Sequence, residues 1–544
     1  MFYISTAIDY TNGSPHIGHA YEKVLADVIA RWQRMRGEEV FFLTGVDQHG
    51  QKVQQKAAEC GQEPQQYADE ATARFRALWE ELGLSYDAWA ATTDPRHKSC
   101  VQKILTALKE KGCLYKKAYK GFYSVRQEQF LTDKERNEEG EFGAEWGEVV
   151  ELAEENWYFN LSQHAAWLKS FVEQSPDVVT PAFRKVELLQ AIERAFDNDL
   201  CISRPKERLS WGIPLPFDED FVTYVWFDAL INYISFAGYL AEDGSGLPDF
   251  NKLWPAACEV IGKDILVPAH GVYWLAMLHA MGFEDNQMPK LLVHGWLNIN
   301  GEKMSKSLGN IVNPMDICKD FGAEPLRYYL VRDTKTGYDS DYDFDRLKML
   351  YNTELSNDLG NLLNRSINMC MRYTEGRVAL AEGDDELSVA LRESLAASTA
   401  RFTERMNAYS TSEALAALNA HVAACNGYIE QTKPWVLVKD EAAMPQLQRV
   451  LYHLIESCAH VGYLLGCVLP EASARILAQL QLDMSGKFVQ DLAWGMLPDG
   501  HALLEPTPVF PRIMSEEEKQ KMAEKAAKAA EKAARKAAAA AQQG

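Results

Sequence analysis

The first 47 residues constrain the fold most, because two apolar runs flank a helical pattern. Residues 2–8 form one run and residues 40–43 the other. Between them, after a turn-rich loop, Val24, Leu25, Val28, Ile29 and Trp32 recur at a spacing of three to four. That spacing is typical of one face of a helix, which Gly37 ends. The segment therefore predicts strand, helix and parallel strand, the repeating unit of an open α/β sheet.

The loop before this helix carries residues suited to binding phosphate. It reads Pro15-His16-Ile17-Gly18-His19 and leads into the predicted helix. Free backbone N–H groups and the helix dipole favour anions at a helix N-terminus. Gly18 lets a nucleotide approach the backbone, and His16 and His19 can donate hydrogen bonds to phosphate oxygens that gain charge during attack at phosphorus. The alternative is that the histidines only cap and pack the helix.

A second cationic segment lies far along the chain. Lys303-Met304-Ser305-Lys306-Ser307 follows an apolar run at 291–299 and an Asn-Gly turn. Two ammonium groups on a mobile loop can close over a triphosphate and stabilise the departing pyrophosphate. Lys303, Ser305 and Lys306 are therefore candidate ATP-binding residues, with Lys303 and Lys306 also catalytic, as are His16 and His19. An ordinary surface loop is the alternative.

Together these segments resemble the HIGH and KMSKS elements of class I aminoacyl-tRNA synthetases, in the same order. Residues 7–13, 45–50 and 225–233 resemble methionyl-tRNA synthetases in particular, and the resemblance extends to about residue 510. It implies a ligase that uses ATP to convert L-methionine to methionyl-adenylate. The enzyme would then transfer methionine to the 3′ end of tRNA(Met), for translation initiation and elongation.

The resemblance also implies an α/β fold with a Rossmann-type catalytic domain, an inserted connective module and a following all-α anticodon-binding domain. An irregular polar stretch begins near Cys113, α/β patterning returns near Leu209, and long helical patterns follow Asp345. The predicted divisions are 1–112 and 206–344 for the catalytic domain, 113–205 for the insertion, 345–514 for the helical domain and 515–544 for an Ala/Lys-rich helical tail.

The stretches shared with methionyl-tRNA synthetases contain candidates for a methionine pocket. An unbranched thioether suits an apolar slot with aromatic walls, and Asp47 offers a carboxylate for the substrate ammonium. The resemblance adds His270 near the sulfur, one residue further from Asp264 than in some members of the family, and Arg204 near the active site. The alternatives are that the aromatic residues only pack in a hydrophobic core and that Arg204 is a surface or ion-paired arginine. The remaining pocket candidates are Ile8, Tyr10, Trp226, Ala229, Leu230 and Tyr233.

Three residues in the helical region match family positions that contact the CAU anticodon: Asn361, Arg365 and Trp435. Unpaired bases are read by stacking on aromatic rings and by hydrogen bonds to their edges. Asn361 and Arg365 are one helical turn apart, so both can reach one base. The alternatives are that Trp435 packs in the core and that Asn361 and Arg365 lie on an ordinary helix face. The basic tail is interpreted as a solvated helix, with a weak contact to the tRNA backbone as its alternative.

Composition limits the partners and metals. A formal net charge of −21 opposes non-specific coating of nucleic acid, so no DNA partner is expected. No stretch approaches the roughly 18 apolar residues of a membrane helix, and a charged leader is lacking, which predicts a cytoplasmic protein without a membrane partner. Many methionyl-tRNA synthetases bind zinc through four cysteines of the connective module, but residues 114–200 contain none. The sequence thus predicts no structural metal, and Mg²⁺ only with ATP.

Two other functions fit the sequence. One is a class I synthetase for another apolar amino acid, which the amino-acid dependence of ATP–pyrophosphate exchange would reveal. The other is a non-catalytic RNA-binding relative that kept the fold and forms no adenylate.

Overall fold

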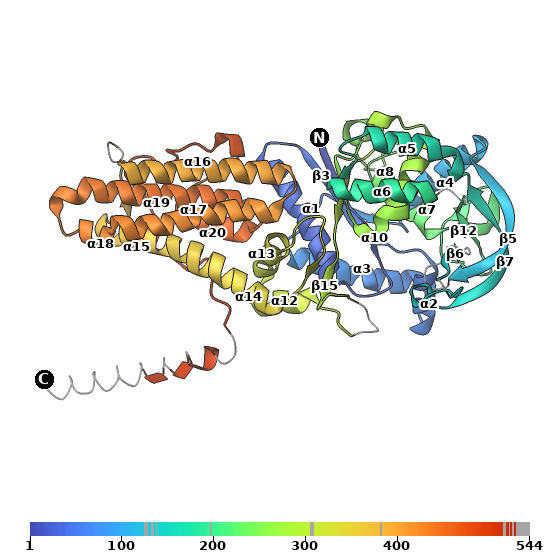
Figure 1. Cartoon of the computed structure of the whole chain (residues 1–544), viewed down its shortest axis with the longest axis horizontal. Helices are drawn as coiled ribbons and strands as arrows, with labels where there is room; N and C mark the ends of the chain where they lie inside the picture. Colours follow the sequence, from blue (N-terminus) through green and yellow to red (C-terminus); the bar gives the residue numbers. More distant parts are fainter. Residues whose placement is uncertain are drawn as a thin grey trace.

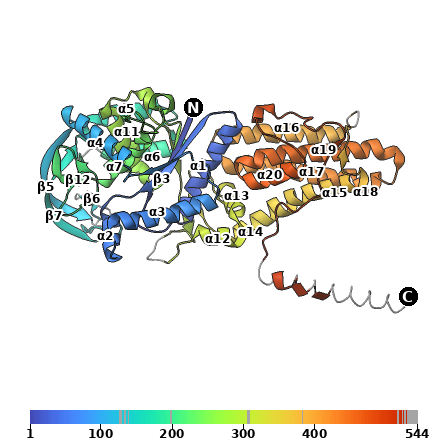
Figure 2. The same cartoon turned by 180° about the vertical axis from the view of Figure 1, so that it is seen from behind.

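The computed structural model describes residues 1–124, 129–131, 135–137, 139–195, 199–304, 309–380, 383, 385–514, 518–521, 523–524 and 527–528. The molecule is elongated, with a mixed α/β body at one end and a bundle of long helices at the other (Figure 1). Seen from behind, helix α1 (Ile17–Met35) lies where the two bodies meet (Figure 2).

A parallel sheet forms the centre of the α/β body. Its strand order is β2-β3-β1-β13-β14-β8, with β4 paired to β3, and every pairing is parallel. Because β1 has β3 on one side and β13 on the other, the strand order reverses there, and ligands bind at the carboxyl ends of strands at such a point. The strands are β1 (Phe2–Thr6), β2 (Asp9–Tyr10), β3 (Val40–Asp47), β4 (Ala88–Ala91), β8 (Val179–Thr180), β13 (Cys258–Gly262) and β14 (Leu291–His294).

Helix α1 is buried on most of its surface. Val24, Leu25, Val28 and Ile29 are each at most 1% exposed. One face packs on β1 and β3, and another packs on α13 (Ala323–Asp333) and the turn at Leu465–Cys467. The helix therefore belongs to the cores of both bodies, and its N-terminus lies beside the sheet.

Further helices and short strands surround the sheet. They are α2 (Gln51–Glu59), α3 (Pro64–Glu81), α4 (Pro95–Glu110), β10 (Ser203–Pro205), β11 (Pro214–Leu215), β12 (Asp218–Thr223), α7 (Val225–Leu230), α8 (Asn232–Ser235), α9 (Phe250–Leu253), α10 (Lys263–Ile265), η4 (Leu266–Trp274), α11 (Leu275–Met281), β15 (Leu297–Ile299), β16 (Glu302–Lys303), α12 (Pro314–Phe321) and β17 (Ser340–Asp341).

The range predicted as an insertion, 113–205, contributes to two sheets. The long strands β5 (Leu114–Ser124) and β7 (Val149–Phe159) pair antiparallel at the outer end of the molecule, with β6 (Gln129–Leu131) and β9 (Leu200–Cys201) beside them (Figure 1). Strand β8, between α5 (Ala165–Gln174) and α6 (Ala182–Ala195), instead pairs with β14 of the parallel sheet. The domain boundaries stay a prediction.

The second body is helical, with one two-stranded ladder, β18 (Arg377–Val378) with β19 (His501–Ala502), among its described residues. Its helices are α14 (Phe344–Leu350), η6 (Tyr351–Gly360), α15 (Asn361–Tyr373), α16 (Glu386–Asn407), α17 (Thr411–Thr432), α18 (Pro434–Leu437), α19 (Met444–Leu464) and α20 (Pro470–Gln479). Most of the predicted tail lies outside the described residues, but Glu518 forms an ion pair with Lys348 at 2.9 Å.

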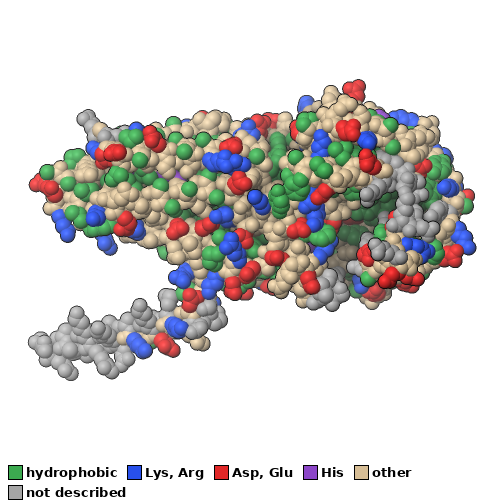
Figure 3. All heavy atoms as spheres, in the orientation of Figure 1, with side chains coloured by type: hydrophobic (Ala, Val, Ile, Leu, Met, Phe, Trp, Pro, Cys, Tyr) green, Lys and Arg blue, Asp and Glu red, His purple; other side chains and the backbone are tan. Residues whose placement is uncertain are grey.

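The surface is mixed in charge. Acidic and basic side chains are interspersed over both bodies on the face shown in Figure 3. Within the described ranges, no helix has both the length and the hydropathy that crossing a membrane requires. A cytoplasmic location stays a prediction.

Glu259 is a buried carboxyl group in the middle of the parallel sheet. It lies on β13, is 0% exposed, and accepts one hydrogen bond, from Trp274 Nε1 at 3.4 Å. Its Oε2 has no partner among the described residues. Burial raises the pKa of Glu259 to about 8, so the folded protein keeps a proton there at neutral pH.

We expect Glu259→Gln to remove part of the pH dependence of stability. The folded state retains a proton that the unfolded chain releases, so the free energy of unfolding falls by about 1.4 kcal/mol per pH unit between the unfolded and folded pKa values. This contribution is fully present at acidic pH and is lost as pH rises through about 8. Glutamine has no proton to release, and urea unfolding of both proteins at acidic and alkaline pH measures the difference in slope.

Glu456→Gln is the matched control. The Glu456 carboxylate accepts hydrogen bonds from the backbone N–H groups of Gly495, Met496 and Leu497 at 2.7–3.1 Å. Burial opposes its ionisation, but His460 and these donors outweigh burial and lower its pKa. This substitution should therefore reduce stability at neutral pH. Identical pH slopes in the wild type and Glu259→Gln would contradict the prediction for Glu259.

Candidate active site

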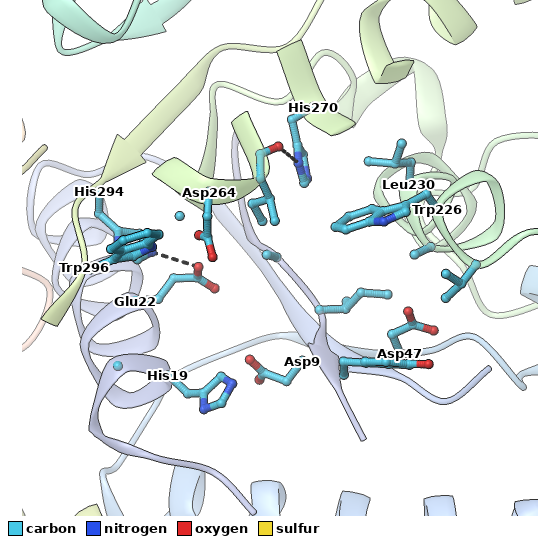
Figure 4. Close-up of a pocket in the computed structure, with 18 of the residues that line it drawn as sticks. Asp9, His19, Glu22, Asp47, Trp226, Leu230, Asp264, His270, His294 and Trp296 are labelled. Atoms are coloured by element: carbon cyan, nitrogen blue, oxygen red, sulfur yellow. Dashed lines mark hydrogen bonds and ion pairs between the residues drawn. The ribbon is translucent and has the colours of Figure 1, made fainter. Parts of the chain in front are cut away.

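A cavity of about 400 Å³ lies at the carboxyl ends of the parallel strands (Figure 4). Residues after β1, β3, β13 and β14 line it, together with α7 and the start of α1. The structure thus brings together segments that are far apart in sequence. The predicted site residues in the lining are Ile8, Tyr10, His16, Gly18, His19, Asp47, Trp226, Ala229, Leu230, Tyr233, His270 and Lys303.

His16 and His19 cap helix α1 and also line the cavity. His16 Nδ1 accepts the Gly18 N–H at 3.1 Å, and His19 Nδ1 accepts the His16 N–H at 3.1 Å. A ring nitrogen that accepts carries no proton. Burial, with the nearby charges of His16 and Lys23, lowers the pKa of His19 well below its usual value and keeps it neutral, so the His19 ring carries its proton on Nε2. The His19 ring thus combines a capping acceptor with an N–H donor.

A buried ionic network beside these histidines was missed from the sequence. Lys23 Nζ lies 2.7 Å from both Asp9 Oδ1 and Glu22 Oε1, and Glu22 Oε2 lies 2.9 Å from His294 Nε2 (Figure 4). Burial and the Glu22 charge raise the pKa of Asp9 to about 7, although Lys23 acts in the opposite direction. The available signal was the adjacent Glu22-Lys23 pair next to the apolar face of the predicted helix.

Aromatic side chains form the other part of the cavity. Trp226 and Leu230 on α7 lie near His270 (Figure 4). His270 Nδ1 donates to Ile265 O at 2.9 Å, so Nε2 is left to accept the Tyr233 hydroxyl at 2.8 Å. Burial lowers the pKa of His270 to about 4, which keeps the ring neutral. The result is an uncharged slot with polarisable walls.

His270 lies in η4, which contains a kink. This segment is a wide π-type turn, and Val267 within it has non-helical dihedral angles, φ −121° and ψ 126°. His270 lines the cavity, as expected.

Asp47 and Lys303 add charges at the cavity. Asp47 ends β3, is 6% exposed and lies below Trp226 in Figure 4. Lys303 is on β16, after Asn300 (φ 52°) and Gly301 (φ 76°), which form the left-handed pair of a tight hairpin turn. Its Nζ lies 3.0 Å from Asp264 Oδ2 and 4.0 Å from the Trp296 ring centre. Ser305 and Lys306 lie outside the described residues.

Asp264, His294 and Trp296 were also missed from the sequence, although His294 ends β14 and the other two come just after a parallel strand. Burial opposes ionisation of Asp264, but the Lys303 ion pair outweighs it and lowers the pKa of Asp264. Their common position at the end of β13 or β14 was the available signal, because ligand sites form at the carboxyl ends of parallel strands.

Arg204 is not part of the described lining, and it is not on the surface. It is 3% exposed on β10, donates to Ser203 O at 2.7 Å, and its guanidinium lies 4.3 Å from the Tyr224 ring centre. Tyr224 does line the cavity. Arg204 therefore contacts the site through a wall residue.

The three predicted anticodon residues lie in the helical body, away from the cavity. Asn361 and Arg365 are in the first turns of α15, and Arg365 forms an ion pair with Glu430 at 2.9 Å. Trp435 on α18 is 38% exposed, so a core role does not account for it. Binding of RNA by these residues stays a prediction.

Metal binding was also considered. In the part of the chain that the structure describes, no group of three or more His, Cys, Asp or Glu side chains could hold a metal ion. Several residues of the predicted insertion, including 125–128, lie outside that part. The absence of structural zinc stays a prediction.

Comparison with known families agrees with this site and fold. The model for class I tRNA synthetases (M) matches residues 2–140 and 146–367. The model for the anticodon binding domain of methionyl tRNA ligase matches residues 379–531. The parallel sheet, the histidines at a helix N-terminus, the lysine on β16 and the following helical domain therefore belong to a class I tRNA synthetase.

Individual relatives specify the family further. The methionine–tRNA ligase of Thermotoga maritima is 39% identical over 523 residues, covering 95% of this chain and 81% of its own. That of Enterococcus faecalis is 39% identical over 529 residues, covering 95% and 78%. The solved Mycobacterium tuberculosis methionyl-tRNA synthetase with methionyl-adenylate has a TM-score of 0.86 at 34% identity, covering 94% of this chain and 99% of that one. The chain belongs to the methionine–tRNA ligase family.

These findings confirm several predictions from the sequence. The family, the class I catalytic fold followed by a helical anticodon-binding domain, and the enzyme class are as expected. The roles of the individual site residues have no such test.

Proposed function

We propose that this cavity activates L-methionine with ATP and that the enzyme then charges tRNA(Met). The observation that carries the proposal is the meeting of two capping histidines, Lys303, Asp47 and an uncharged aromatic slot in one cavity.

Methionine fits between the carboxylate and the slot. Its ammonium group pairs with Asp47, and its thioether lies against Trp226, Tyr233 and His270, where sulfur–ring contacts are favourable. Ile8, Tyr10, Ala229 and Leu230 complete the pocket. Selection against smaller apolar side chains by burial yields only about 1–3 kcal/mol per methylene-sized difference. Selection of methionine therefore also requires that the walls of the pocket keep a fixed distance from one another.

ATP lies beside the N-terminus of α1. His16 and His19 donate hydrogen bonds to phosphate oxygens, Gly18 leaves room for the nucleotide, and Lys303, Ser305 and Lys306 bind the phosphates. ATP enters as its Mg²⁺ complex, in which phosphate oxygens and water supply most ligands.

No covalent enzyme intermediate is needed. A methionine carboxylate oxygen attacks the α-phosphorus in line and forms the new P–O bond. The bond to the bridging oxygen breaks, and pyrophosphate leaves with the electron pair. The 2′-hydroxyl of the terminal ribose of tRNA then attacks the adenylate carbonyl and displaces AMP. Positioning and preorganised positive charge account for the rate.

The decisive experiment is amino-acid-dependent ATP–pyrophosphate exchange with Met, Leu, Ile, Val and Cys, repeated with Lys306→Ala. Exchange with methionine alone, largely lost in the variant, is the expected result. Exchange driven by another amino acid would overturn the specificity. Absence of exchange with all five would favour a binding protein that kept the fold.

Trp435→Ala is expected to weaken tRNA binding without changing adenylate formation. Stacking of a base on an aromatic ring contributes about 1–3 kcal/mol, so Kd for tRNA(Met) should rise by about 5- to 150-fold. Filter binding measures Kd, and exchange without tRNA measures the cavity. Val436→Ala, a truncation on the same helix α18 of a side chain that is 50% exposed, is the control. Equal losses of affinity in the two variants would contradict the stacking role.

A further inference from the structure

A buried carboxylate joins two walls of the cavity from behind. Asp228 lies on α7, is 0% exposed, and contacts two imidazole rings from other segments. Its Oδ2 lies 2.6 Å from His49 Nδ1, and its Oδ1 lies 2.8 Å from His97 Nε2. None of these three side chains belongs to the described lining of the cavity. They therefore cannot act on a substrate by contact.

The geometry of this cluster and its charge determine which of its atoms carry protons. Burial opposes ionisation of Asp228, but His49 and His97 outweigh burial and hold its pKa at about 2. The ionised carboxylate can only accept, so His49 Nδ1 and His97 Nε2 are both donors. His97 Nδ1 lies 2.8 Å from Ser235 Oγ on α8, which fixes the second ring as well. Hydrogen bonds to a buried charge are among the strongest in proteins.

The same cluster reaches the carboxylate at the opposite wall. His49 is two residues after Asp47, and its backbone N–H donates to Asp47 Oδ1 at 3.3 Å. Thr92 Oγ1 donates to the same oxygen at 3.3 Å, and the Trp211 ring packs edge-on against His49 at 5.4 Å between ring centres. The loop that presents Asp47 is therefore tied directly to α7.

Helix α7 carries the aromatic wall. Trp226, Ala229 and Leu230 flank Asp228 in sequence and line the cavity. An amino acid that places its ammonium on Asp47 and its side-chain tip against this wall must span the distance between the two. The Asp228–His49 contact directly joins this helix to the segment that carries Asp47.

We propose that the Asp228–His49 bridge, braced by His97, positions Asp47 relative to α7 and so sets the length of the amino acid side chain that the cavity accepts. This inference rests on the proposed function, in which Asp47 binds the substrate ammonium. His49, His97 and Asp228 are positioning residues.

The test compares methionine with ethionine, which is longer by one methylene, in pyrophosphate exchange. His49→Ala removes the charged hydrogen bond, so the preference for methionine over ethionine in kcat/KM should fall by about tenfold or more. KM for methionine should rise, and KM for ATP should stay close to that of the wild type. His49→Asn places an amide N–H near the position of Nδ1 and should restore most of the preference.

The control is His421→Ala, which deletes another imidazole that is 0% exposed, on α17, where its ring contacts Ser394 and Cys425. It should lower thermal stability without changing the preference for methionine. If His49→Ala fails to fold, Asp228→Asn gives the same readout, because one acceptor oxygen becomes a donor amide.

A further variant separates this inference from the proposed function. If Asp47→Asn leaves KM for methionine unchanged, the assignment of the ammonium site fails. If Asp47→Asn raises that KM but His49→Ala and Asp228→Asn both keep the full preference for methionine over ethionine, the bridge is only structural and the inference is overturned.

Discussion

Replacing His19 with alanine is expected to reduce kcat for methionine-dependent pyrophosphate exchange by ~10²–10³-fold, the usual cost of removing one preorganised donor at a centre of developing charge. His19 is half-buried and neutral, and its Nδ1 already accepts the His16 N–H. Its Nε2–H is therefore aimed by the helix start itself and needs no reorganisation when the α-phosphorus is attacked. Steady-state exchange at saturating ATP and methionine measures the effect.

Two amide variants separate this role from helix capping, which alone contributes about 1 kcal/mol to stability. His19→Asn puts an acceptor near the position of Nδ1 and keeps the cap, but it loses the distal donor. His19→Gln puts an amide near the position of Nε2 and loses the cap. We expect the Asn variant to keep its Tm and lose activity, and the Gln variant to recover part of kcat. The reverse pattern would mean that His19 is only a cap.

The parts of the site that could be predicted are those encoded locally. Apolar periodicity over 2–43 predicts strand, helix and strand, and the observed β1, α1 and β3 follow it within a few residues. His16 caps the start of α1, Asp47 ends β3, and Lys303 lies in the β15–β16 hairpin. Their place at one edge of the sheet therefore follows from topology.

The parts that could not be predicted depend on pairing between distant segments. The Glu22–His294 contact joins residues 272 positions apart, and neither residue has a local pattern that names its partner. Strand β8 has two residues, too few for any periodicity to show. The long strands β5 and β7 carry many charged residues, most of them exposed, so their sequences lack the apolar alternation from which a strand is predicted.

The capping histidines acquire their position from a helix that is held from both sides. Asp27, in the middle of α1, is 0% exposed, and its Oδ2 lies 2.7 Å from Arg327 Nη2. Arg327 is 1% exposed and also donates to Leu82 O and to Val468 O, at 3.0 and 2.8 Å. One guanidinium thus connects α1 to α13, to the end of α3 and to the helical body.

Asp27→Ala is expected to lower the free energy of unfolding by about 3–5 kcal/mol, because it leaves this guanidinium buried without its counter-charge. Burial opposes ionisation of Asp27, but Arg327 and Arg31 outweigh it and lower its pKa, so the pair stays ionised at neutral pH. Urea unfolding followed by tryptophan fluorescence measures the loss. Glu193→Ala, which breaks the exposed Lys169–Glu193 pair at 3.0 Å, should cost less than about 1 kcal/mol.

The double variant Asp27→Ala with Arg327→Met distinguishes loss of a contact from burial of an unpaired charge. Removing both charges leaves no ion to desolvate, so the double variant should be more stable than Asp27→Ala alone. The free energy of unfolding is compared with that of Asp27→Ala and of Arg327→Met alone. If the losses of these two single variants simply add in the double variant, the pair is not coupled and α1 is held by packing alone. If they do not add, the ion pair itself fixes the helix whose N-terminus carries His16 and His19.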